Sequence, residues 1–125
     1  MTALSFVVPG TPIPKARPRV YGKRTITDPR TVAYEALVRM HALKARQLAK
    51  RSGITWPLDA EYRVSIDFFV PDKRRRDVDN LLKSFLDACN AVLWDDDSQV
   101  SHIEAARQIA GHRGAEAMVL VEVLP

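Results

Sequence analysis

The sequence lacks several features of secreted and membrane proteins. It has one cysteine, Cys89, so no disulfide can form within the chain, as expected for a reducing compartment. No apolar run approaches the roughly 18 residues that a membrane helix needs. The first residues also lack the charged and then apolar stretch of a signal peptide. We therefore expect a cytoplasmic protein without a membrane partner.

Two other kinds of site are missing from the sequence. No glycine-rich phosphate loop occurs, which disfavours a nucleotide cofactor. His41, His102 and His112 are scattered, so a zinc site is not expected. Cys89 falls on the apolar face of a predicted helix, where a packed core residue is favoured over a nucleophile.

Charge is unevenly distributed along the chain. The 125 residues carry a formal charge of +4, with basic residues concentrated at 15–30, 39–51 and 73–76 and aspartates at 77–97. A basic surface around an acidic focus suits a polyanion that must approach metal-binding carboxylates. Charge alone is weak evidence, because many basic domains never bind nucleic acid.

The apolar pattern predicts one α+β domain over residues 1–125. Asp28 and Pro29 are a favourable helix start, and Gly53 ends the same helix. We expect its buried stripe to be Ala33, Leu37, Met40, Leu43 and Leu48. A second helix is expected at about 79–93, and strands at 4–8, 62–70, 100–109 and 117–124, the last two as an antiparallel hairpin. The prediction is a small mixed β-sheet with two main helices packed mostly on one face.

Each of two basic segments has two possible roles. Four prolines between positions 9 and 18 exclude regular structure there and predict an extended arm that carries Lys15, Arg17 and Arg19. This arm could follow DNA phosphates or be a plain surface loop. The basic outer face of the first helix could be a solvated surface, the default interpretation, or a contact with the DNA backbone.

The most informative stretch joins a strand to a helix. Four consecutive cations, Lys73, Arg74, Arg75 and Arg76, precede Asp77 and Asp79. Two residues apart in an extended connection, the aspartates point the same way and could reach one ion. A bound phosphate would neutralise the cations, and a bound divalent metal would neutralise the carboxylates. The alternative is that an aspartate only caps the helix.

A lysine and a second acidic cluster follow. Lys83 lies four residues after Asp79, on the same helix face, and could stabilise charge on a scissile phosphate. A simple surface ladder from Asp79 through Lys83 to Asp87 is the alternative. Asp95, Asp96 and Asp97 face the negative end of the helix dipole, which suggests a use other than stability. Capping of local turn amides remains the competing interpretation. Hard oxygen ligands select Mg²⁺, with Mn²⁺ as a possible substitute.

These motifs resemble those of the RusA family of Holliday junction resolvases, which are common in prophages. The resemblance covers the arginine run, Asp77-Val78-Asp79-Asn80-Leu81, Lys83, and the segment from Trp94 to Val100, and the segment Pro14–Arg19 is also similar. It implies a homodimer with Asp77, Asp79 and Asp97 as metal ligands and Lys83 as a catalytic residue. It gives Asp96 and Asn80 secondary roles at the site.

The resemblance implies an Mg²⁺-dependent endodeoxyribonuclease that resolves four-way DNA by paired symmetric nicks in recombination and repair. Two identical sites related by a dyad suit the near two-fold symmetry of a junction. The arm and the arginine run, from Lys15 to Arg19 and Lys73 to Arg76, are then expected to bind DNA. The alternative is a non-catalytic, phage-derived DNA-binding or regulatory module with a structural acidic cluster.

Overall fold

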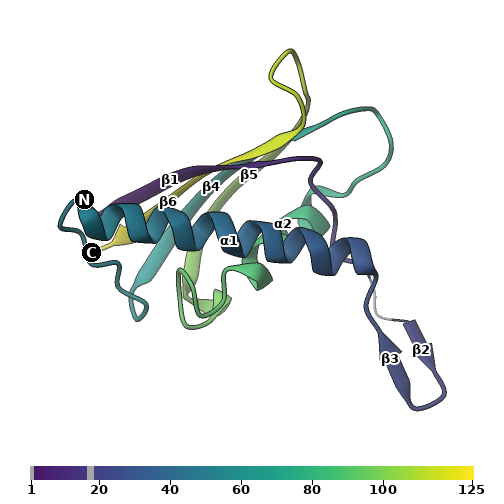
Figure 1. The fold of residues 1–125 in the computed structure, drawn as a ribbon, viewed down its shortest axis with the longest axis horizontal. Coiled ribbons are helices and arrows are strands. Elements are labelled where there is room, and N and C mark those ends of the chain that lie inside the picture. The colour runs from purple at the N-terminus through teal and green to yellow at the C-terminus, as the bar shows by residue number, and fades with distance from the viewer. Residues whose placement is uncertain (1, 17–18) are drawn as a thin grey trace.

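The computed structural model describes residues 2–16 and 19–125 and divides them into two helices, one 3₁₀ turn and six strands (Figure 1). Arg17 and the side chain of Arg19, both expected to bind DNA, lie outside the described part. The elements in order are β1 (Ala3–Pro9), β2 (Arg19–Tyr21), β3 (Arg24–Ile26), α1 (Pro29–Arg51), β4 (Glu61–Val70), α2 (Val78–Ala88), η1 (Asp97–Gln99), β5 (Val100–Ile109) and β6 (Glu116–Leu124).

The main sheet is mixed, with the strand order β1-β6-β4-β5. β5 runs parallel to β4, as a strand–helix–strand crossover through α2 requires, and β6 is antiparallel to both of its neighbours. The expected hairpin of 100–109 with 117–124 is therefore wrong, because β4 lies between these strands. β6 is mostly apolar and occupies the interior of the sheet, whereas the more polar β5 forms an edge.

Both helices cover the same face of the sheet, as predicted (Figure 1). Alternate residues of β4 show this directly: Tyr62, Val64, Ile66, Phe68 and Val70 are buried, while their neighbours on the strand are not. The aromatic side chains of this core that are fully buried are Tyr62, Phe68, Phe85 and Trp94. The single α+β domain with a mixed sheet is confirmed.

The buried stripe of α1 differs from the expected one. Thr31, Tyr34, Val38, Ala42, Ala45 and Ala49 are buried, whereas Met40, Leu43 and Leu48 are exposed. The buried set repeats every three or four residues and ends in alanines, whose small size allows the helix to approach its neighbours closely. Of the expected stripe, only Leu37 packs against the core, so the prediction from helical spacing is wrong for the other four residues. No helix in residues 2–16 and 19–125 is long and apolar enough to cross a membrane.

Helix α2 ends five residues earlier than expected. Cys89 is its C-cap, and Ala91 has a φ of 66°, a left-handed conformation that cannot continue the helix. Two arginines of α1 stabilise this end: Arg39 donates from Nε to the carbonyl of Ala88 at 3.2 Å, and Arg46 donates to the carbonyl of Val92 at 3.3 Å. These two outer-face cations therefore bind protein carbonyls.

The N-terminal arm is pinned across the body and continues into a small hairpin that the sequence did not predict. The amide of Lys15 donates to the carbonyl of Asn80 at 2.9 Å, and the hydroxyl of Thr31 donates to the carbonyl of Pro14 at 3.4 Å. Beyond this anchor, β2 and β3 pair with each other and project past the start of α1 (Figure 1). Gly22, with a φ of 60°, allows the tight turn between them.

Candidate metal and DNA site

Asp77 and Asp79 lie together where the connection after β4 enters the first turn of α2. Both side chains line a shallow pocket whose other wall is Ala105, Ala106 and Arg107 of β5. The guanidinium of Arg107 donates to the carbonyl of Arg76, which ties the edge strand to this connection. The two aspartates are thus held beside the middle of the edge strand.

The carboxylate of Asp77 does not cap the helix that it precedes. Asp77 occupies the N-cap position of α2, but its side chain accepts no capping hydrogen bond. Among the described residues, its side chain pairs with Arg75 alone, whose Nε lies 3.3 Å from Asp77 Oδ1. The Arg75 side chain is 88% exposed, so this ion pair is weak and easily exchanged. Helix capping therefore does not account for Asp77.

Asp97 lies at the other end of α2. It begins η1, directly before β5, and in the parallel register the start of β5 faces Tyr62 while its end faces Val70. An 11-residue helix such as α2 is about 16 Å long. Within residues 2–16 and 19–125, no three His, Cys, Asp or Glu side chains gather closely enough to hold a metal. The expected meeting of Asp77, Asp79 and Asp97 does not occur within one subunit.

Asp96 caps the local turn, which is one of the two roles that the sequence analysis allowed for this acidic cluster. Its Oδ2 accepts a hydrogen bond from the amide of Ser98 at 3.0 Å, and the side chain of Gln99 accepts from the amide of Asp96 at 2.8 Å, which completes a capping box. The bond from Ser98 lowers the pKa of the Asp96 carboxyl below its usual value. Gln99 also donates to the carbonyls of Leu58 and Ala60, at 2.8 Å each. Asp96 therefore shapes the turn that presents Asp97.

The cation run divides into exposed side chains and one that stabilises the loop. Lys73, Arg74 and Arg75 are exposed. Arg76 is 12% exposed and donates to Asp72 Oδ1 at 2.8 Å. The hydrogen bond from Arg76 is the main cause of a pKa of Asp72 below its usual range. Three cations can thus meet a phosphate, while Arg76 holds the loop that carries them.

Comparison with known protein families identifies the chain. The model of the family described as Endodeoxyribonuclease RusA matches residues 9–123. The chain belongs to the RusA family. No curated protein matches the sequence. Membership makes the protein an endodeoxyribonuclease and implies resolution of Holliday junctions, so a non-catalytic module is no longer supported.

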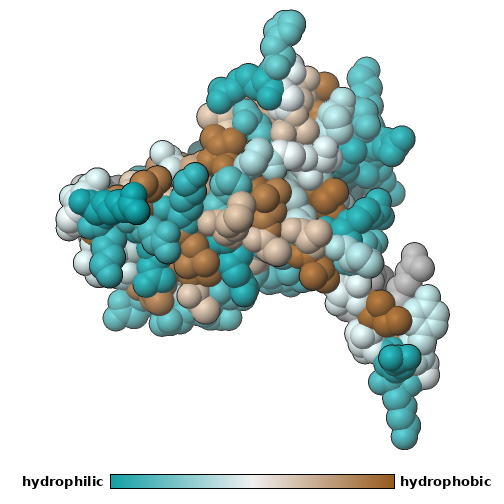
Figure 2. Space-filling view, in the orientation of Figure 1, coloured by the Kyte–Doolittle hydropathy of each residue, from teal (hydrophilic) through white to brown (hydrophobic). Residues whose placement is uncertain are grey.

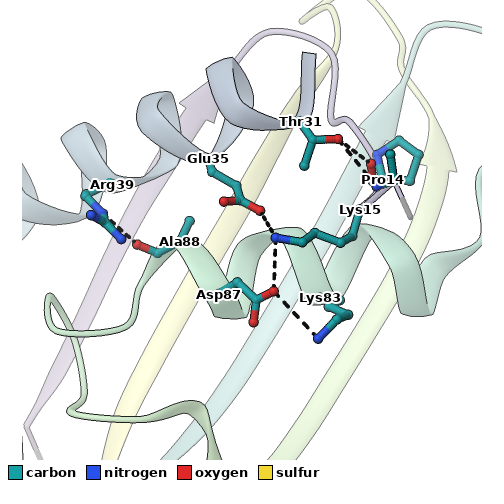
Figure 3. A network of polar contacts seen from close by, with 9 residues as sticks. Pro14, Lys15, Thr31, Glu35, Arg39, Lys83, Asp87 and Ala88 are labelled. Atoms are coloured by element: carbon teal, nitrogen blue, oxygen red, sulfur yellow. Dashed lines mark hydrogen bonds and ion pairs between the residues drawn. The ribbon is translucent and has the colours of Figure 1, made fainter. Parts of the chain in front are cut away.

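Lys15, which the sequence predicts to bind DNA, bridges the two helices of this RusA chain (Figure 3). Its Nζ lies 2.5 Å from Glu35 Oε1 of α1 and 3.3 Å from Asp87 Oδ2 of α2. Burial pulls the pKa of Lys15 down, but these bonds outweigh it and raise the pKa above its usual value. The side chain is 23% exposed and fixes the arm to the helices.

Lys83 points along α2 toward Asp87, with its Nζ 3.6 Å from Asp87 Oδ2 (Figure 3). It is 60% exposed and remains free to turn. Asn80, also expected near the site, accepts the arm's amide through its backbone carbonyl. Sequence and structure therefore place Lys83 one turn from Asp79, and Asn80 between the site and the arm.

A second groove joins the aspartates to the base of the hairpin. It is lined by Arg74, Arg75, Arg76, Asp77 and Asn80 on one side, and by Ile13–Ala16, Asp28, Arg30 and Thr31 on the other. Arg75 and Asp77 also line the pocket of Asp79, so the two depressions adjoin. Arg30, in the first turn of α1, also lines this groove. It was not predicted as a site residue, because it belongs to no recognisable sequence motif. The result is a cationic path that leads from the acidic site to the hairpin.

Proposed function

We propose that this protein is a magnesium-dependent, structure-specific endonuclease that resolves four-way DNA junctions by paired nicks. The observation that carries the proposal is the carboxylate of Asp77, which serves neither a cap nor the core and lies beside Asp79 among exposed arginines. Such an arrangement places anionic ligands for a cation within reach of a phosphate-binding surface.

The donor set fits a hard divalent ion. Magnesium is usually bound by one or two carboxylates, with water and substrate phosphate completing its coordination. Asp77 and Asp79 supply two carboxylates at an open, exposed position where a phosphate can enter. When bound, the ion would supply a more acidic water and charge stabilisation at the phosphate under attack. We expect Mn²⁺ to substitute.

The cationic side chains have separate tasks in this proposal. Arg75 neutralises Asp77 in the free protein and can exchange that contact for a phosphate, because its side chain is almost fully exposed. Arg74 and Lys73 bind neighbouring phosphates on the same loop. Lys83 turns from Asp87 toward the scissile phosphate and stabilises the charge that develops there.

The position of Asp97 suggests that each centre is built by two subunits. Asp97 cannot reach Asp79 from the far end of α2, yet in this proposal its carboxylate is a ligand. Among the described residues, its carboxylate has no hydrogen-bond or ion-pair partner. We propose a homodimer in which Asp97 of the partner subunit completes the site of Asp77 and Asp79.

The edge strand β5 offers a route to such a dimer. It spans ten residues, most of them exposed, with Ile103 and Ile109 about half exposed. An unpaired edge of this length favours addition of another strand. Two antiparallel copies of β5 related by a dyad at His102 would set residue 97 of one opposite residue 107 of the other, beside the pocket of Asp79. Both sites would then be completed together.

Paired nicks follow from that symmetry. A two-fold dimer carries two equivalent sites, and a junction presents two strands of like polarity related by nearly the same axis. A single subunit would supply neither site. The proposal therefore links dimerisation, metal binding and symmetric cutting.

Cleavage of a mobile four-way junction tests the function. The protein with Mg²⁺ should introduce symmetric nicks, EDTA should abolish them, and Asp79→Asn should reduce the rate at least about 100-fold. Glu122→Gln, at a carboxylate of β6, two strands away from the edge strand β5, is the matched control and should cut normally. Equal cutting by Asp79→Asn and the parent, or cutting in EDTA, would refute the proposed site.

A further inference from the structure

The proposed function assigns no role to the β2–β3 hairpin. It projects beyond α1 as a separate arm (Figures 1 and 2). Two-stranded hairpins without a packed face have marginal stability in water. Within the described residues, no hydrogen bond or ion pair joins residues 20–27 to the rest of the protein. Its surface is therefore available to a partner.

The side chains of the hairpin combine apolar and cationic groups. Val20 is 69% exposed and Tyr21 is 56% exposed. Tyr21 lies directly opposite Arg24 in the antiparallel register, so the ring and the guanidinium lie on one face. Lys23 follows in the turn. An exposed aromatic ring beside a guanidinium is a stacking surface for a nucleic-acid base.

The positive charge of the hairpin and its flanking residues favours a polyanion as the partner. Residues 15–27 contain five Lys or Arg and no Asp or Glu. A second copy of the same segment would repel it, whereas a polyanion would not. The groove lined by Arg74, Arg75 and Arg30 leads from Asp77 to the two ends of the hairpin, at Ala16 and Asp28. A strand bound along this groove is directed to the hairpin.

We propose that the β2–β3 hairpin binds the branch point of the DNA, with Tyr21 stacking on a base that has lost its neighbour there and Lys23 and Arg24 holding adjacent phosphates. Base pairs in a linear duplex are stacked on both faces and offer no such surface. The hairpin thus contributes to selection of branched over linear DNA. This inference rests on the proposed function, since it assumes a branched DNA substrate.

The test compares Tyr21→Ala and Tyr21→Phe with the parent, using the full chain without divalent metal. Fluorescence anisotropy measures binding to a four-way junction and to a linear duplex of equal length. Stacking on one base accounts for about a 5- to 150-fold change in affinity. Tyr21→Ala should lose that factor on the junction and less than about two-fold on the duplex, and Tyr21→Phe should bind both like the parent. Leu48→Ala, at another exposed apolar side chain, should change neither.

A 2-aminopurine at the branch point gives a second readout. Its fluorescence should change when the parent or Tyr21→Phe binds, but not with Tyr21→Ala. Junction binding by Tyr21→Ala equal to the parent's, or a loss that is equal on duplex, would overturn the inference. So would a change in molecular mass of this variant, since the hairpin would then be a subunit contact. If the parent itself neither prefers junctions nor cuts them, the proposed function fails instead.

Discussion

Mixing two inactive variants would decide whether one or two subunits build each centre. Asp79→Asn removes one of the proposed ligands and Asp97→Asn another, so each homodimer should be inactive on a four-way junction. The two residues lie at opposite ends of α2, an 11-residue helix of about 16 Å, while metal–oxygen distances are about 2 Å. They therefore cannot hold one ion within a subunit unless the fold rearranges.

The shared-site arrangement predicts recovery on mixing. An equal mixture that exchanges subunits freely contains about half heterodimers. In each heterodimer one centre combines the intact Asp79 of one chain with the intact Asp97 of the other, and the second centre carries both substitutions. About one quarter of the normal number of centres returns, and every active dimer has only one.

The assay is a supercoiled plasmid with an extruded cruciform, on which single nicks give open circles and paired nicks give linear DNA. The mixture should give open circles at about one quarter of the normal rate, with almost no linear product. Each variant alone should give neither. If exchange is verified by mass and the mixture stays inactive, both ligands act from one chain and the shared centre is refuted.

Three side chains outside the aspartates give further predictions. Arg75→Ala should weaken junction binding and reduce the slope of log affinity against log salt by about 0.9, while calorimetry finds Mn²⁺ binding unchanged or tighter, because the pair with Asp77 is lost. Lys15→Met should lower the free energy of unfolding by about 1–2 kcal/mol in urea at pH 8, since two carboxylates lose their shared cation. Because folding raises the pKa of Lys15, that advantage is complete below about pH 10 and fades as pH rises through the higher folded value. Cys89→Ser should cost about 1–3 kcal/mol, because a hydroxyl replaces a fully buried thiol, and the native thiol should react with a thiol reagent only after unfolding.

The sequence predicted those parts of the fold that depend on local rules. The start of α1 at Pro29 and the alternating burial of β4 follow from capping and periodicity, and both are observed. Strand order is not local. β5 and β6 are joined by a short loop, yet β6 pairs with β4 because its apolar residues need an interior position. The pattern of polar residues on β5 was the available signal for an edge strand.

The sequence predicted that Asp77 and Asp79 lie together, but it did not predict where Asp97 lies. Adjacent positions placed Asp77 and Asp79 together, because two residues in one connection must lie close. The position of Asp97 depends on the path of residues 89–96 after α2 and on the register of β5, neither of which follows from residue spacing. The capping box of Asp96 and Gln99 and the bridge made by Lys15 need tertiary partners and could not be inferred from spacing. The β2–β3 hairpin was not predicted because its strands have only three residues each, and Gly22 was the one sequence signal for its turn.

The aromatic packing around Tyr62 gives the molecule an internal optical reporter with a defined location. Trp56 stacks on Tyr62 with ring centroids 5.8 Å apart, Trp94 lies 5.7 Å from the same ring, and these two are the only tryptophans in the sequence. Both are buried beside the turn that presents Asp97. Their emission should therefore respond to loosening of that turn and stay silent when the distant hairpin changes, so local melting of one end can be followed without any added dye.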